Sequence, residues 1–149
     1  MTRPDPESGT PGGHRDRGAA AIELVLLAPV ILLVMAVMVG GARVWLARAA
    51  VADAAQSAAR AASLEYAAGP AGAQGREIGL AALTDVPCAR RAVVIDTAGF
   101  GVAVGVPATV SAQVTCAVDL GDLLGFGLPG TITVQAEGHA ALDTYRRRR

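Results

Sequence analysis

The spacing of hydrophobic residues changes along the chain and predicts helix first and strands later. Residues 24–42 are nineteen consecutive uncharged residues, a run that would rise about 28 Å as a helix and match the roughly 30 Å hydrocarbon core of a bilayer. From residue 43 to residue 68, polar side chains recur at helical spacing in an Ala-rich segment, which predicts an amphipathic continuation. We expect Gly69 and Pro70 to end this helix.

Beyond residue 68 the pattern weakens and then switches to strands. Residues 71–84 are a second helical candidate, and strands are predicted over residues 92–95, 100–106, 109–119 and 131–136. The strand over 109–119 directs its apolar residues to one face, which we expect to pack on the amphipathic helix. The predicted fold class is α+β: a long N-terminal transmembrane and amphipathic helix followed by a small antiparallel β-sheet domain.

Composition and charge exclude several classes of function. The chain has 149 residues, a formal net charge of zero and 3% aromatic residues, so it lacks the basic field and the stacking surfaces that would indicate a nucleic-acid partner. His14 and His139 stand far apart, and no phosphate-binding or serine-nucleophile motif occurs. We therefore expect no enzyme activity, no metal and no cofactor.

Glu23 directly precedes the apolar run, and Gly18 lies five residues before it. A charge at the edge of hydrocarbon costs free energy unless something pairs with it, so Glu23 is a candidate functional residue. The alternative is that Glu23 favours the positive end of its own helix, an effect worth typically 0.3–1 kcal/mol.

A signal peptide is the competing interpretation of the N-terminal segment. Ala47-Arg48-Ala49 has the small-x-small form of a signal-peptidase site, which would place cleavage after Ala49. The apolar run is longer than a usual signal-peptide core, however, and Glu23 lies where such a core is normally uncharged. In this alternative the protein is a secreted or single-pass membrane-anchored binding domain unrelated to pili.

Cys88 and Cys116 are the two cysteines of the chain, and they leave two interpretations open. Cys116 lies on the apolar face of a predicted strand, which suits an unpaired core thiol. A disulfide between the two would instead stabilise the domain by roughly 3–4 kcal/mol and require an oxidising exterior. In that case the leader lies in the cytoplasm and the sheet outside.

The segment from Arg17 through Gly18 and Glu23 to Pro29, with the apolar run behind it, resembles the start of a type IV prepilin. The Ala-rich residues 49–62 and the segment 124–134 extend the resemblance. From Arg15 to about Tyr145 the chain is similar to the TadE-like minor pilins of the tight-adherence (Flp-type) type IV pilus system.

This resemblance implies that a prepilin peptidase cuts after Gly18, which makes Ala19 the mature N-terminus. It further implies that Glu23 pairs with the N-terminal amine of an adjacent subunit, and that the partners are the membrane, other pilin or pseudopilin subunits and the pilus assembly platform. The implied organisation is a cytoplasmic leader over 1–18, a transmembrane helix over 19–42, an amphipathic extension over 43–68, an extracytoplasmic α+β domain over 69–145 and a basic tail over 146–149.

Overall fold

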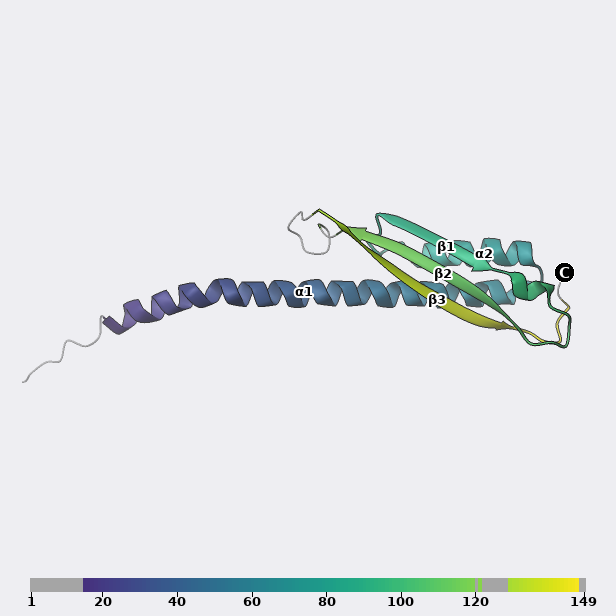
Figure 1. The fold of residues 1–149 in the computed structure, drawn as a ribbon, viewed down its shortest axis with the longest axis horizontal. Helices are drawn as coiled ribbons and strands as arrows, with labels where there is room; N and C mark the ends of the chain where they lie inside the picture. Colours follow the sequence, from purple (N-terminus) through teal and green to yellow (C-terminus); the bar gives the residue numbers. More distant parts are fainter. Residues whose placement is uncertain (1–14, 120, 122–128, 148–149) are drawn as a thin grey trace, which may run out of the picture. The chain divides into compact units, whose positions relative to one another are not determined.

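The computed structural model describes residues 15–119, 121 and 129–147, with side chains described from residue 23 onward. The elements in chain order are α1 (Arg15–Leu64), α2 (Ala68–Ala81), β1 (Arg90–Asp96), the short 3-10 helix η1 (Ala98–Gly101), β2 (Ala108–Asp119) and β3 (Thr131–Leu142) (Figure 1). The chain divides into two compact units, Met1–Met38 and Val39–Arg149, and α1 contributes to both. We call them unit 1 and unit 2. The predicted α+β class is confirmed.

Three sequence expectations concern residues that lie outside this described part. They are the cytoplasmic leader up to residue 14, the part of the family resemblance over residues 124–128, and the last two residues of the basic tail.

Helix α1 ends at Leu64. The sequence pattern predicted that it would continue to residue 68. Gly69 and Pro70 do not end it, because both lie in the first turn of α2. Proline is tolerated at that place, since the first backbone N–H groups of a helix have no partner within the helix. The Gly-Pro pair thus belongs to the start of the second helix.

The three strands form one antiparallel sheet in the order β1-β2-β3. In the central strand, Val114 stands opposite Val93 of β1 and opposite Ala136 of β3. The strands predicted over residues 92–95, 109–119 and 131–136 are confirmed, and β3 continues to Leu142. The sheet is therefore longer on the β3 side than the sequence pattern indicated.

The strand predicted over residues 100–106 is wrong, because this segment forms η1 and a turn. A carboxylate oxygen of Asp96 accepts a hydrogen bond from the backbone N–H of Ala98 at 2.9 Å, and this local turn leads the chain out of β1. Gly105 has a φ of +93°, a conformation that suits glycine. Its N–H donates to the carbonyl of Thr144 at 2.8 Å, which holds the turn against the end of the chain.

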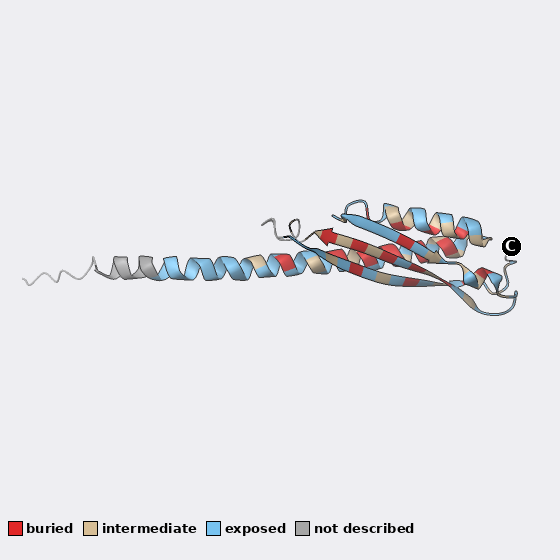
Figure 2. Cartoon of the chain, turned by 45° about the horizontal axis from the view of Figure 1, so that its top comes forward, coloured by how far each residue is buried: buried red, intermediate tan, exposed pale blue. Residues whose placement is uncertain are grey.

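The core of unit 2 forms where the sheet packs on the second half of α1. The apolar face of β2 is buried, from Val110 to Val118 on alternate residues. The facing side of α1 carries small residues at helical spacing: Ala47, Val51, Ala54, Ala55, Ala58, Ala59 and Ala62. Figure 2 shows these buried residues as red bands along the strands and along one side of the helix. The predicted packing of the sheet on the amphipathic helix is confirmed.

Three glycines lie where α2 and β3 come close to neighbouring elements. A Cβ atom at Gly138 of β3 would meet the backbone carbonyl of Ala55 and lie 2.6 Å from the backbone nitrogen of Gln56. At Gly75 and at Gly79 of α2, an added Cβ would lie 3.0 Å from its nearest neighbour. The helix-sheet spacing in unit 2 therefore depends on the absence of side chains at these positions.

Arg146 ties the end of the chain to the end of α1. Its Nη2 donates hydrogen bonds to the carbonyls of Ser63 at 3.0 Å and Glu65 at 2.8 Å, and its guanidinium lies 4.4 Å from the centre of the Tyr66 ring. Carbonyls at a helix C-terminus lack partners within the helix. Arg146, the first residue of the predicted basic tail, therefore caps the C-terminal end of α1.

We expect Arg146→Ala to lower the free energy of unfolding by about 1–2 kcal/mol, because it removes charge-assisted hydrogen bonds and a cation–π contact at a partly exposed site. Chemical unfolding of the full chain in detergent micelles measures the change. The matched control is Arg147→Ala, which removes an exposed neighbouring arginine and should change stability by less than about 0.5 kcal/mol. Equal losses in the two variants would contradict the capping role.

Candidate membrane-anchoring and processing site

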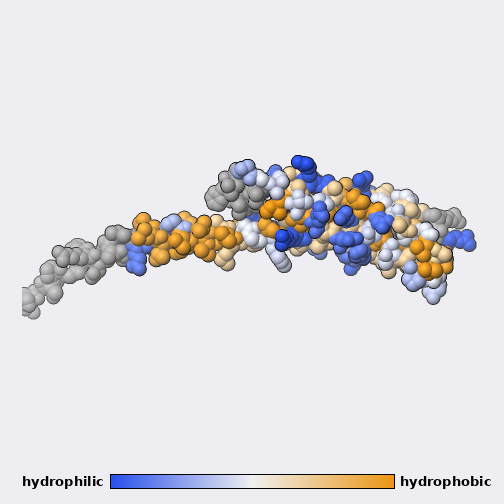
Figure 3. All heavy atoms as spheres, viewed as in Figure 1, coloured by the Kyte–Doolittle hydropathy of each residue, from blue (hydrophilic) through white to orange (hydrophobic). Residues whose placement is uncertain are grey.

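The first half of α1 exposes apolar side chains on every side of the helix. The thirteen large apolar residues between Leu24 and Val39 are 49–70% exposed. A surface helix of a soluble protein normally hides one apolar stripe, whereas a helix that is apolar all round needs lipid or protein around it. Figure 3 shows hydrophobic atoms covering this part of the chain.

By length and composition, the described helix Glu23–Leu64 can cross a membrane. Only 6% of its most apolar 18-residue stretch is buried within the structure, which distinguishes this stretch from the core helix of a soluble domain. The chain is therefore compatible with single-pass anchoring through its N-terminal helix.

The three residues predicted for processing and assembly lie on one short segment of α1. The helix begins at Arg15, so the backbone of Gly18 and Ala19 is already helical, and Glu23 stands one turn beyond Ala19 with its side chain exposed. Residues four apart share a face of a helix and lie about 6 Å apart along its axis. The exposed carboxylate is accessible to a cationic partner.

Cys88 and Cys116 form a disulfide in unit 2, with their Cα atoms 5.4 Å apart. Cys116 is buried in β2, whereas Cys88 lies in the segment before β1. Beside the bond, the backbone N–H of Ala89 donates to the carbonyl of Ala117 at 2.8 Å. The disulfide thus fastens the connection between α2 and β1 to the centre of the sheet.

Removing this bond by Cys88→Ala with Cys116→Ala should destabilise unit 2 by roughly 3–4 kcal/mol, because the unfolded chain regains the entropy of a loop of 28 residues. Thermal unfolding of the full chain in detergent micelles, with and without a reductant, measures the effect. The reductant should lower the melting temperature of the parent chain and leave that of the double variant unchanged. A parent chain insensitive to reductant under conditions that open the bond would contradict the prediction.

Other chemistry is sparse in the part of the chain that the structure describes. No group of three or more His, Cys, Asp or Glu residues there could hold a metal ion. His139 is exposed, with its Nε2 3.7 Å from a carboxylate oxygen of Glu137, while His14 lies outside the described residues. The sequence did not predict the contacts of Arg146 and Gly138 with α1. The residues around each of them show no pattern that would indicate a partner far away in the chain.

Comparison with known proteins finds a family match in the N-terminal part of the chain. Residues 18–60 match the model of a family described as TadE-like protein. No curated protein and no solved structure shows a significant match to the chain. The predicted resemblance to the TadE-like family is therefore confirmed over the segment that holds Gly18, Glu23 and the exposed apolar helix.

Proposed function

We propose that this chain is a minor pilin or pseudopilin of a Tad (Flp-type) type IV pilus. The observation that carries the proposal is an apolar helix exposed on all sides with Glu23 at its entrance, inside the segment that matches the TadE-like family. Before assembly this helix anchors the chain in the membrane. In the pilus machinery it packs among other subunits, which supply the apolar surroundings that lipid supplied before.

Cleavage after Gly18 and pairing of Glu23 form one mechanism in this proposal. A membrane prepilin peptidase cuts the chain, and the new N-terminus at Ala19 carries an ammonium group. A carboxylate and an ammonium that leave water each lose hydration energy, which their mutual attraction offsets. Pairing between Glu23 of one subunit and the amine of its neighbour then fixes the axial register of the two helices.

The proposed orientation places the leader in the cytoplasm and unit 2 on the extracytoplasmic side. The disulfide between Cys88 and Cys116 supports this orientation, because disulfides persist in oxidising compartments. A partly aqueous position also suits Trp45, which is 69% exposed just beyond the apolar run and would lie at the membrane interface.

Packing in unit 2 argues against the alternative of signal-peptidase cleavage after Ala49. Ala47 belongs to the buried core and Val44 packs against it, so a cut at Ala49 would remove both from the domain. The cut would also divide α1 two residues before the fully buried Val51. Cleavage after Gly18 leaves this packing intact.

N-terminal sequencing and intact mass of the mature protein test the proposal. We expect the mature chain to begin at Ala19 in cells with the prepilin peptidase and at the unprocessed N-terminus in cells without it. Gly18→Leu should block cleavage, because a side chain at the scissile position obstructs a peptidase that requires glycine there, whereas Gly13→Leu in the leader should not. A mature chain that begins at Ala50 would establish the signal-peptide alternative instead.

A further inference from the structure

Unit 2 exposes large hydrophobic side chains at the end where α1 stops. We call this surface the tip patch: Leu64, Tyr66, Val104, Val106 and Tyr145, which are 49–87% exposed. The patch contains both tyrosines of the chain. Exposed apolar patches with aromatic residues commonly mark protein–protein contact sites.

Two contacts bring these separate segments of the chain together. The guanidinium of Arg146 lies on the Tyr66 ring, which places the neighbouring Tyr145 beside the end of α1. The N–H of Gly105 donates to the carbonyl of Thr144, which places the turn with Val104 and Val106 beside the same tail. These contacts place the segments that carry the tip patch close together, and Tyr145, at 87% exposure, is its most exposed side chain.

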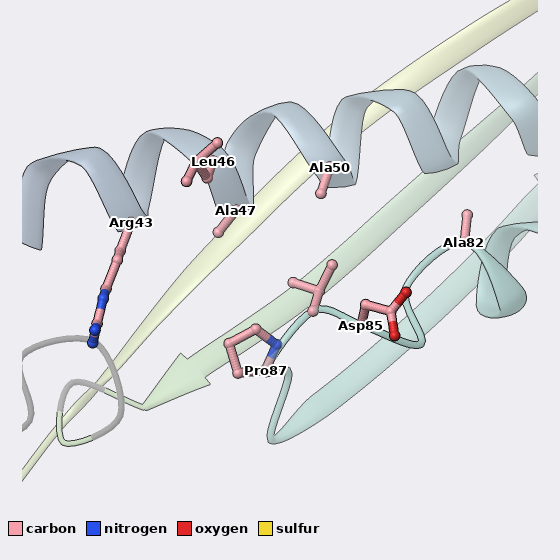
Figure 4. Close-up of a pocket in the computed structure, with 8 residues that line it drawn as sticks. Arg43, Leu46, Ala47, Ala50, Ala82, Asp85 and Pro87 are labelled. Carbon is pink, nitrogen blue, oxygen red and sulfur yellow. The ribbon is translucent and has the colours of Figure 1, made fainter.

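A hollow of about 540 Å³ lies at the other end of the same stretch of α1, inside unit 2. Leu46, Ala47 and Ala50 of α1 form one wall, and Val86 and Pro87 of the connection between α2 and β1 form the facing wall (Figure 4). Its volume is in the range of sites that enclose a small molecule or an anchoring side chain. We call this the proximal hollow.

The tip patch and the proximal hollow complement each other in shape and charge. Tyr145 projects from the tip patch, whereas the hollow is concave, mostly apolar and open to solvent. The exposed Arg147 comes two residues after Tyr145, and the exposed Asp85 lines the hollow. Arg43 also lines the hollow but already has an interaction partner within the chain. A tyrosine flanked by arginine is the composition typical of interface anchors.

We infer that a second copy of this chain binds head to tail, with Tyr145 of one copy in the proximal hollow of the next and Arg147 beside its Asp85. The two surfaces differ, so the contact is heterologous and leaves a free tip patch and a free hollow at the ends of every oligomer. Leu46 lies at the proximal hollow and Leu64 at the tip patch, eighteen residues apart on α1. Contact between the tip of one copy and the hollow of the next therefore offsets the two copies by about 27 Å along the helix. Subunits that leave a membrane one after another would be displaced along the axis in this way. The head-to-tail contact rests on the proposed function and extends it. It involves residues of unit 2 and is separate from the pairing of Glu23.

Cysteine cross-linking of the full chain in piliated cells tests the contact. Val104→Cys combined with Ala82→Cys in one chain places reactive thiols on the tip patch and at the hollow and keeps Tyr145 in place, while Cys88 and Cys116 are bonded to each other. A short bis-maleimide should produce a ladder of dimers, trimers and larger species from the double variant. Each single variant alone should give no ladder, and the two single variants expressed together should give dimers only.

A charge exchange in the same double variant identifies the partner residues. Asp85→Arg or Arg147→Glu should each lower the ladder yield at least about fivefold, because like charges then meet, and the two together should restore it. As the matched control, Val104→Cys with Gln113→Cys, on the exposed face of β2, should give no ladder.

Three outcomes would overturn the contact: no ladder, a ladder from the control pair, or dimers from Val104→Cys alone, which would indicate a tip-to-tip arrangement. The N-terminus of the same protein is sequenced in parallel. A start other than Ala19 contradicts the proposed function, whereas absence of the ladder contradicts the head-to-tail contact, whether or not the chain is processed.

Discussion

Pilus preparations from cells that carry Glu23→Ala are expected to contain at least roughly a hundredfold less of this chain than preparations with the parent chain. In the proposed mechanism, the ammonium at Ala19 then enters an apolar environment without its carboxylate, and removing one partner of a buried ion pair costs about 3–5 kcal/mol. Membrane insertion and cleavage after Gly18 should remain, because neither requires the pairing. Quantitative immunoblots of sheared pili and of membranes, together with N-terminal sequencing, measure the three effects.

The magnitude separates the two interpretations of Glu23. If the carboxylate only favours the N-terminal end of its own helix, the loss is typically 0.3–1 kcal/mol, and incorporation should fall by less than about sixfold. Glu77→Ala is the matched control, because it removes an exposed carboxylate from α2 in unit 2 and should leave incorporation unchanged. Normal incorporation of the Glu23→Ala chain would refute the pairing.

Gly138→Ala is expected to destabilise unit 2 by about 3 kcal/mol, the upper end of the usual range for overpacked cores. The new Cβ would meet the backbone of Ala55 and Gln56 on α1, and backbone atoms inside a helix cannot move aside as a side chain can. Either β3 shifts away from α1 or the helix bends, and both responses open the packing between Ala55 and the sheet. Chemical unfolding of the full chain in detergent micelles measures the loss.

Gly69→Ala is the matched control for this variant. A Cβ at Gly69 would have no neighbour within 4 Å, and alanine favours a helix more than glycine does. This variant should therefore be as stable as the parent chain or slightly more stable. A Gly138→Ala chain with parent-like stability would contradict the close packing of β3 on α1.

Much of the site is readable in the sequence because it depends on local order along the chain. Gly18, Glu23 and the uncharged run follow one another within one segment of the chain. Their spacing predicts the proposed cleavage position, the charged residue and the membrane-spanning stretch without any contact to a distant segment. The alternation over residues 109–119 likewise revealed which face of β2 is buried. The error at Gly69 and Pro70 arose because the same pair is compatible with a helix end and with the first turn of the next helix.

The sequence by itself determined that this chain carries a membrane-length helix with an acid at its entrance, followed by a small sheet with one apolar face. Tertiary structure alone decided that Gly138 must lack a side chain, that Arg146 caps α1, and that the tip patch and the proximal hollow exist at all. Periodicity follows from interactions between residues a few positions apart. These latter features join residues up to 83 positions apart, and only the packing of β3 and the C-terminal segment on α1 brings such residues into contact.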